Sequence, residues 1–264
     1  DAYLNWDTMA ALSKALKEHD KAAFCELPFC HTVEAEALGG IVNYGNETAG
    51  PRAKEYICTS PEELLTLPKI DFSSGRIHEV LLACKALREA GEHVVLQVSG
   101  PLTILNVLID AKYVFKAMRK KPELMKEVFW KLGAEILRFM EEGKKYGADL
   151  ISYADSSGGV NILGPKMAGQ VVEDFTYGFL KKAEMLADGK TMILLCPKTA
   201  FALLGTGKAR FRDLKLPEPM AYGEGCIEMI GKVKMAGQMC IKNVGYWLEN
   251  GIFKEVVLED CADS

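Results

Sequence analysis

Short apolar runs alternate with longer segments of helical period along this chain of 264 residues. Alternation of this kind is typical of βα units built around a parallel sheet. The runs richest in apolar and β-branched residues are predicted strands at Ala22–Phe29, Val94–Val98, Leu150–Tyr153, Met192–Cys196, Phe211–Leu216 and Met239–Lys242. The pattern therefore predicts an α/β fold.

Helix signals fill the segments between these runs. Ser60 and Glu63 fit a helix start in which the serine caps the first turn and the glutamate closes a capping box. From Pro122, apolar residues recur at helical spacing until Gly147 ends the segment. No short repeat and no low-complexity linker interrupts the chain, so we expect one domain over residues 1–264.

Two arrangements fit this order of strands and helices: an open, doubly wound sheet or a closed (β/α)8 TIM barrel. A doubly wound nucleotide-binding fold normally has a glycine-rich turn after an early strand, and neither GxGxxG nor GxxxxGK[ST] occurs here. This absence favours the barrel. Because the chemistry of a barrel sits at the carboxyl ends of its strands, the residues that follow each run are the candidates for a site.

Charge and cysteine usage narrow the class of partner. A formal net charge of -4 gives no basic footprint for nucleic acid or an anionic membrane, and no apolar run is long enough to span a bilayer. The 8 cysteines form no CxxC motif, and several lie inside apolar runs, where a thiol packs as a small hydrophobic group. We therefore expect a cytoplasmic protein that binds a small molecule or another protein.

The segment after the first strand is densely polar. Thr32 can cap a short helix that carries Glu34 and Glu36 on a solvated first turn, and a functional role for the two glutamates is the open alternative. His31 can likewise belong to the surface or to a cap. The candidate substrate-binding residues here are Glu26, Phe29, Cys30 and His31.

The next two strands end in polar residues beside small ones. Gln97 and Ser99 precede a Gly-Pro pair that opens a helix, and either side chain can point into the barrel mouth. Tyr153 and Asp155 end the following strand, before a loop of small residues. A carboxylate there is costly to bury unless it is paired, hydrogen-bonded or used, so we favour a catalytic Asp155 over one that caps its own loop.

The later strands add fewer candidates. Cys196 ends its strand beside Lys198, where a thiol can act as a nucleophile or metal ligand, although a lone buried cysteine is more often inert. Asn243 follows the last run as a possible hydrogen-bond donor to substrate. The chain has no GxSxG and no HExxH motif, and its 4 histidines are scattered.

Several of these segments resemble methylcobamide:coenzyme M methyltransferases, which are members of the uroporphyrinogen decarboxylase superfamily. The likeness is carried by Pro-Phe-Cys-His-Thr-Val-Glu-Ala-Glu-Ala-Leu-Gly at 28–39, Ser-Gly-Pro-Leu-Thr at 99–103 and Gly-Ala-Asp-Leu-Ile-Ser-Tyr-Ala-Asp at 147–155. Shorter matches at 120–124 and 162–165 extend it over most of the chain. The resemblance implies a TIM barrel and the transfer of a methyl group to or from a corrinoid.

The resemblance also implies partners and a metal. In that family a separate corrinoid-binding protein presents the corrinoid at the barrel mouth, and a His-x-Cys pair with a distant cysteine holds a zinc that activates the acceptor thiol. Cys196 falls on the cysteine of the pair, whereas Leu194 stands where the histidine is expected. The distant cysteine belongs after the last strand, which Cys261 precedes, and we expect the first and eighth barrel strands outside these residues. A tetrahedral zinc site with one ligand left is not expected to form.

The sequence therefore predicts a corrinoid-dependent methyltransferase that moves a methyl group between a corrinoid protein and a small acceptor such as a thiol or a folate. One alternative is a uroporphyrinogen decarboxylase, although its arginine-rich amino-terminal motif is not visible and its Phe-Ser-Asp segment is replaced by Glu-Leu-Pro-Phe-Cys at 26–30. The other alternative is a barrel that binds a corrinoid or tetrapyrrole without catalysis.

Overall fold

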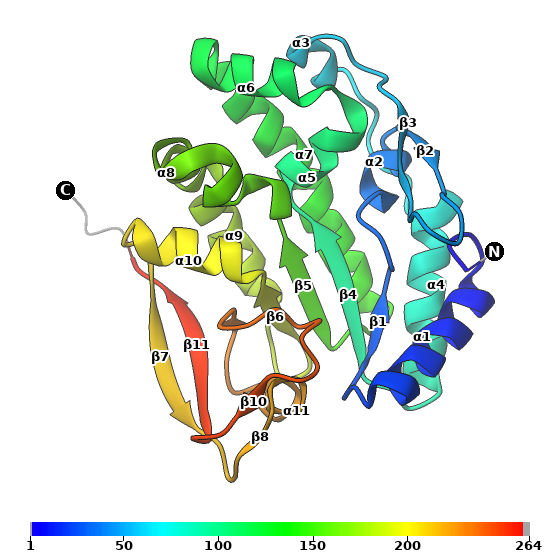
Figure 1. Cartoon of the computed structure of the whole chain (residues 1–264), viewed down its shortest axis with the longest axis vertical. Coiled ribbons are helices and arrows are strands. Elements are labelled where there is room, and N and C mark those ends of the chain that lie inside the picture. Colours follow the sequence, from blue (N-terminus) through cyan, green and yellow to red (C-terminus); the bar gives the residue numbers. More distant parts are fainter. Residues whose placement is uncertain (1, 261–264) are drawn as a thin grey trace.

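The computed structural model describes residues 2–260, and its centre is a seven-stranded sheet (Figure 1). The strand order is β1 (Cys25–Leu27), β4 (Val94–Ser99), β5 (Leu150–Ala154), β6 (Met192–Leu195), β9 (Met235–Ala236), β11 (Ile252–Leu258) and β7 (Ala209–Lys215). The pairs from β1 to β9 are parallel, whereas β11 runs antiparallel to both of its neighbours. The α/β prediction is confirmed, and the mostly parallel sheet fits a TIM barrel.

The predicted strands are found up to β6, and the later part of the chain differs. β7 covers the predicted run at 211–216, but it pairs antiparallel with β11, which was not predicted. The strand predicted at Met239–Lys242 is wrong, because this segment is a turn in which the backbone N–H of Asn243 donates to the carbonyl of Cys240 at 2.9 Å. The segment is apolar because Ile241 is buried in the second hydrophobic core, on the inner side of the sheet.

Helices cover the outer face of the parallel strands, as the alternating pattern predicts. The larger ones are α1 (Trp6–Asp20), α4 (Gly75–Glu89), α5 (Pro101–Leu108), α6 (Ala111–Lys120), α7 (Pro122–Lys145), α8 (Val160–Val171), α9 (Tyr177–Ala183) and α10 (Pro197–Gly205). The shorter elements are α2 (Val33–Ala37), α3 (Pro61–Leu64), α11 (Tyr222–Glu228), the β2–β3 hairpin (Ile41–Asn43 and Arg52–Glu55) and the pair β8–β10 (Met220–Ala221 and Trp247–Leu248). α3 begins where it was predicted, but the predicted capping box is wrong, because Ser60 makes no side-chain cap and Glu63 accepts the backbone N–H of Thr59 at 2.9 Å instead.

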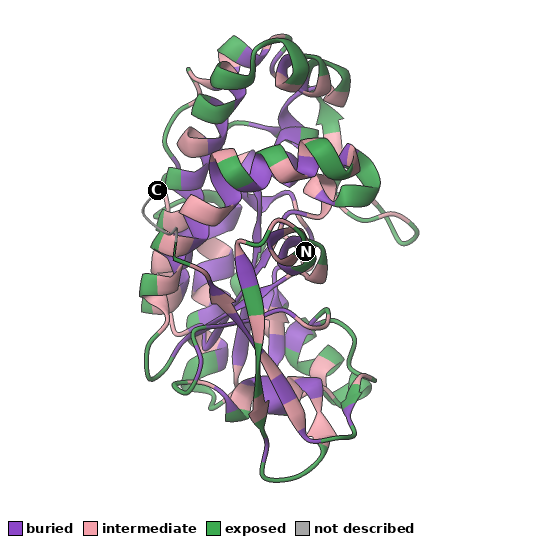
Figure 2. Cartoon of the chain, turned by 90° about the vertical axis from the view of Figure 1, so that its left-hand side faces the viewer, coloured by how far each residue is buried: buried purple, intermediate pink, exposed green. Residues whose placement is uncertain are grey.

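The two faces of the sheet pack against different partners. Side chains alternate along each strand, so one set faces the helices and the other faces the inner side. On the inner side, Val95 and Leu194 form a second apolar core with Tyr222 of α11 and Phe253 of β11. Burying one such side chain contributes about 1.5–3 kcal/mol. Figure 2 shows the buried residues concentrated along the sheet and on the helix faces against it. Apolar residues between Leu214 and Phe253 therefore supply most of the second core on the inner side.

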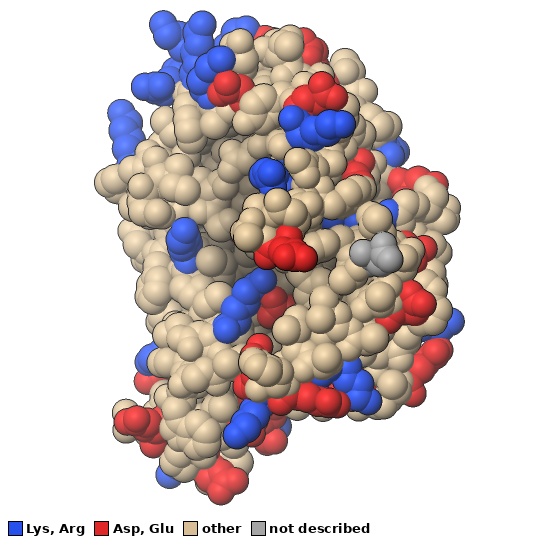
Figure 3. All heavy atoms as spheres, turned by 45° about the vertical axis from the view of Figure 1, so that its right-hand side comes forward, with Lys and Arg blue, Asp and Glu red and all other residues tan. Residues whose placement is uncertain are grey.

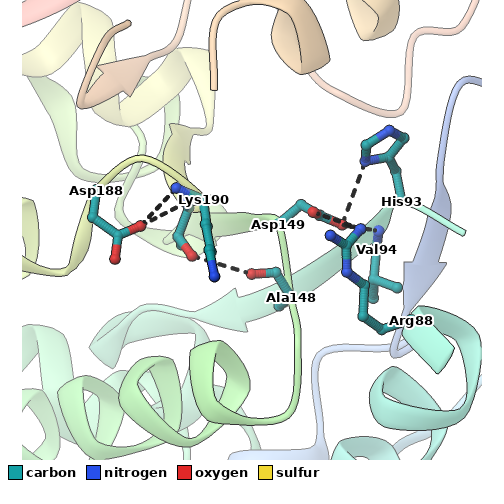
Figure 4. Close-up of polar contacts among 8 residues, drawn as sticks. Arg88, His93, Val94, Ala148, Asp149, Asp188 and Lys190 are labelled. Carbon is teal, nitrogen blue, oxygen red and sulfur yellow. Dashed lines mark hydrogen bonds and ion pairs between the residues drawn. The ribbon is translucent and has the colours of Figure 1, made fainter. Parts of the chain in front are cut away.

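The amino-terminal ends of β4 and β5 are joined by a polar cluster (Figure 4). Asp149 is buried and accepts the Val94 backbone N–H at 2.9 Å, while Arg88 lies 3.0 Å and His93 3.5 Å from its carboxylate oxygens. These contacts align two neighbouring strands at the end opposite to the predicted site, where a barrel is built for stability. In the part of the chain that the structure describes, no helix is long and apolar enough to cross a membrane.

Candidate functional site

The segment after β1 is organised by a buried arginine. Arg76, from the first turn of α4, donates to the Thr32 hydroxyl at 2.7 Å and to the Cys30 sulfur at 3.2 Å, and it forms an ion pair with Glu36. Thr32 makes no side-chain cap on α2, so its predicted capping role is wrong. Sequence reasoning missed Arg76 because it lies more than 40 residues after its partners. Arg76 fixes the conformation of the polar segment.

Glu34 joins this segment to the neighbouring strand. Only 1% of Glu34 is exposed, and its Oε1 accepts the backbone N–H of Ser99 at 2.6 Å. Its Oε2 is buried without a partner. Burial raises the pKa of Glu34, and the hydrogen bonds from Ser99 only partly oppose this. The solvated first turn expected for Glu34 is therefore wrong, and a buried carboxyl group lies where β1 and β4 end.

Gln97 and Ser99 lie on the inner face of β4, the face that they share with Val95. Both are buried, and the Nε2 atom of Gln97 has no hydrogen-bond partner in the described chain. Their positions alternate with Val98, which packs against the helices. The end of β4 thus carries an amide N–H group, on Gln97, that has no hydrogen-bond acceptor among the described residues.

Glu26 and His31 lie beside the loop after β9. Glu26 forms an ion pair with Lys242 at 2.8 Å, and both residues line a groove with Phe29 along α1. The Nδ1 atom of His31 is buried without a partner, and burial together with the charge of Lys242 lowers the pKa of His31. Its imidazole is therefore neutral at neutral pH. Asn243 is exposed next to Lys242 and donates to the sulfur of Met239 at 3.6 Å.

Asp155 has a structural task at the end of β5. One carboxylate oxygen accepts the Thr103 backbone N–H at 2.8 Å and its hydroxyl at 3.0 Å, and the other accepts the Leu102 N–H at 3.2 Å. It therefore caps α5 rather than its own loop. Gly100 allows this approach, because a Cβ there would lie 2.3 Å from the Cβ of Asp155. Burial raises the pKa of Asp155 to about 6.

Tyr153 lies apart from the other candidates. It pairs with Val98 across the sheet, and its ring packs on Phe179 of α9 with 5.2 Å between the ring centroids. It therefore faces the helices, whereas Gln97 and Ser99 face the inner side. Its hydroxyl is buried without a partner, and burial raises its pKa well above the ordinary value.

The residues around Cys196 do not fit the zinc site that the resemblance implies. Leu194 is buried in the inner apolar core opposite Ala236, and Cys196 stands half-buried at the amino terminus of α10. Burial raises the pKa of the Cys196 thiol, although the backbone N–H groups of Lys198 and Thr199 partly oppose it. Within residues 2–260, no group of three His, Cys, Asp or Glu residues could hold a metal ion, and Cys261 lies outside this range.

The structure therefore divides the candidates into two groups. Glu26, Cys30, His31, Gln97 and Ser99 lie around the ends of β1 and β4, where Glu34 and Arg76 join them. Asp155 and Cys196 follow β5 and β6, on the side of α5 and α10. Signals in the sequence identified most of the first group, but nothing local to Arg76 identified it.

Known proteins are similar to this chain over most of its length. Two methylcobamide:CoM methyltransferases MtaA, from Methanosarcina barkeri strain Fusaro and from Methanosarcina barkeri, are 24% and 25% identical over 243 residues, which covers 90% of this chain and 70% of each relative. The solved structure of a methyltransferase from Methanosarcina mazei has a TM-score of 0.66 and 24% identity, and the match spans 78% of this chain but only 61% of that one. The uroporphyrinogen decarboxylase (URO-D) family model matches residues 1–208. The chain therefore belongs to the uroporphyrinogen decarboxylase family.

Proposed function

We propose that this protein is a corrinoid-dependent methyltransferase that moves a methyl group between a corrinoid protein and a small acceptor, a thiol or a folate. The observation that carries the proposal is the set of unpartnered buried polar atoms near the ends of β1 and β4: His31 Nδ1, Glu34 Oε2 and Gln97 Nε2. Leaving a buried polar group unsatisfied costs about 1–3 kcal/mol. A bound acceptor that hydrogen-bonds to these atoms would recover this free energy.

The segment that holds two of these atoms also supports methyl transfer. His31 and Glu34 lie within residues 28–39, the stretch that most resembles methylcobamide:coenzyme M methyltransferases, and the relatives named above carry that activity in their names. The identity to these relatives is 24–25%, and the nature of the acceptor is therefore itself part of what we propose.

Each side chain then has a role that follows from its protonation state. Burial raises the pKa of Glu34, so its carboxyl group can donate a hydrogen bond to the acceptor when it is protonated, and the Gln97 amide can donate another. His31 is neutral and can take the proton that the acceptor must lose before it attacks the methyl group. The corrinoid, when bound, supplies the methyl group as an electrophile.

The scheme uses no zinc, because Leu194 replaces the expected histidine and, within residues 2–260, Cys196 has no companion ligands for a metal ion. We infer that the acceptor is deprotonated by His31. The acceptor atom would lose its proton to the His31 imidazole and gain the methyl group, and the corrinoid would leave with the electron pair of its bond to that methyl group.

The test is to mix the protein with methylcobalamin and either a thiol or tetrahydrofolate and to follow the cobalamin spectrum. Demethylation that depends on the protein and on one acceptor is the expected result. A flat spectrum with both acceptors, together with loss of carboxylates from uroporphyrinogen on chromatography, would identify a decarboxylase instead. Binding of methylcobalamin without turnover would identify a non-catalytic barrel.

A further inference from the structure

Helix α6 carries an unusual distribution of charge. Its ten residues include Lys112, Lys116, Arg119 and Lys120, all exposed, and no acidic residue. The spacing of three or four residues places these side chains along one face, while Val114 and Ala117 are buried on the other. Figure 3 shows Lys and Arg side chains gathered at the top of the molecule, over α6. The whole chain, in contrast, has a net charge of -4.

The charges on α6 are not explained by the fold. Like charges at this spacing destabilise a helix, and two other helices place an acid beside a base at the same spacing: Glu135 with Arg138 in α7 and Lys85 with Glu89 in α4. The helix dipole favours Arg119 and Lys120 in the last turn, but it does not favour Lys112 and Lys116. Lys112 pairs with Asp110, and among residues 2–260 the other three have no acidic partner.

The position of α6 connects this patch to the site. α5 starts directly after β4, α6 follows it, and α7 returns toward the start of β5. α6 therefore lies on the side of the carboxyl ends of the strands, as Figure 1 shows at the top of the molecule. A protein that brings a methyl group to the carboxyl ends of the strands would approach the side of the molecule on which α6 lies.

The geometry points to α6 as an electrostatic docking surface for an acidic face of the protein that carries the corrinoid. This inference rests on the proposed function, which requires a protein-bound methyl donor. A helix of ten residues is about 15 Å long, which suits one patch on a protein partner. A membrane would need an apolar face, and the apolar face of α6 is used inside the protein.

The experiment compares two methyl donors on charge-reversed protein. The donors are a corrinoid-binding protein with an acidic surface, loaded with methylcobalamin, and free methylcobalamin. The variant is Lys116→Glu/Lys120→Glu, and the matched control is Lys190→Glu/Lys215→Glu, which reverses two exposed lysines remote from α6 in sequence. Lys190 lies near the amino-terminal end of the sheet in Figure 4.

The expected result is that the α6 variant lowers the rate with the protein donor by about tenfold or more relative to the rate with the free donor. This difference should disappear in about 1 M salt, where charges are screened within about 3 Å. Equal effects of the two variants, or no effect of either, would overturn the inference.

Direct binding separates this inference from the proposed function. If free methylcobalamin is not demethylated, the proposed function fails, and calorimetry with the loaded corrinoid protein still tests the surface. Binding that weakens with the α6 variant but not with the control supports the inference. No binding of that protein, or α6-dependent binding of duplex DNA or anionic vesicles in its place, contradicts it.

Discussion

The carboxylate of Glu34 accepts the backbone N–H of Ser99 at 2.6 Å and so connects the segment after β1 to the end of β4. We expect Glu34→Ala to leave this buried N–H unsatisfied and to lower the free energy of unfolding by about 1–3 kcal/mol. Glu34→Gln keeps an acceptor and should cost less. Urea denaturation measures both, with the exposed Glu47→Ala as control. Equal stability of Glu34→Ala and wild type would contradict the role given to this bond.

His31 is the proposed proton acceptor. His31→Gln should lower the rate of methyl transfer from methylcobalamin by at least about a hundredfold, because a general base typically contributes that much. The exposed His19→Gln is the matched control. Because burial and Lys242 lower the pKa of His31, the wild-type rate should fall only when the pH drops below the ordinary histidine range. A rate that His31→Gln leaves unchanged would remove His31 from the mechanism.

Asp155 makes stability depend on pH. Its pKa is about 6 in the folded protein against 3.8 as the ordinary value, so between these limits the native state binds the proton that the unfolded state has released. The native state is then favoured at low pH, and this contribution is lost as the pH rises from about 4 to about 6. The loss is of the order of 3 kcal/mol.

Asp155→Asn should remove this pH dependence, since the amide does not titrate. The measurement is the free energy of unfolding of wild type minus that of the variant, at pH 4 and at pH 7. The difference should be smaller at pH 7. A difference that is constant over this range would show that the Asp155 carboxyl is not perturbed.

A substitution of Tyr153 tests whether the helix-facing side of β5 takes part in the reaction. Since its ring faces α9, Tyr153→Phe should leave methyl transfer within about twofold of wild type, and removing an unsatisfied buried hydroxyl should not destabilise the fold. Steady-state rates and thermal melting measure these effects. A loss of rate without a loss of stability would mean that the hydroxyl reaches the substrate.

The zinc content of the purified protein tests whether Cys196, at the end of β6, is part of a zinc site. Purified protein should contain well below one zinc per chain, and Cys196→Ala should leave this content unchanged, because a tetrahedral site needs more ligands than Cys196 provides. Elemental analysis by mass spectrometry after dialysis gives the answer. One zinc per chain that is lost in Cys196→Ala would restore the metal site implied by the resemblance.

β4, β5 and β6 could be predicted because each is a mostly apolar run that is buried on both faces. The hairpin strands β2 and β3 were not predicted, because they are short and largely exposed. β11 was missed because Lys254 and Glu255 interrupt its pattern. Glu255 is buried only with the help of Arg212, whose guanidinium lies 2.5 Å from it on β7. Arg212 lies 43 residues before Glu255, so a local stretch of sequence around β11 does not contain the partner that allows this glutamate to be buried.

The candidate site shows the same division. Polar residues at or just after the end of a strand were enough to suggest Gln97, Ser99 and His31 as candidates. The residues that decide their state come from other elements: Arg76 from α4, and Lys242 from the loop after β9. Asp155 was favoured as catalytic because a buried carboxylate needs partners. Its capping partners, Leu102 and Thr103, lie more than 50 residues earlier, where the local sequence does not reveal them.

The apolar core on the inner side also sets the depth of the site. Val95 belongs to this core, and Gln97, two residues further along β4, is the next side chain on that face, about 7 Å nearer the open end. The apolar core therefore reaches to within one pair of residues of the carboxyl end of β4. Under the proposed function, the corrinoid would be held outside this core by the protein that carries it, and this chain would only have to receive it at the ends of the strands.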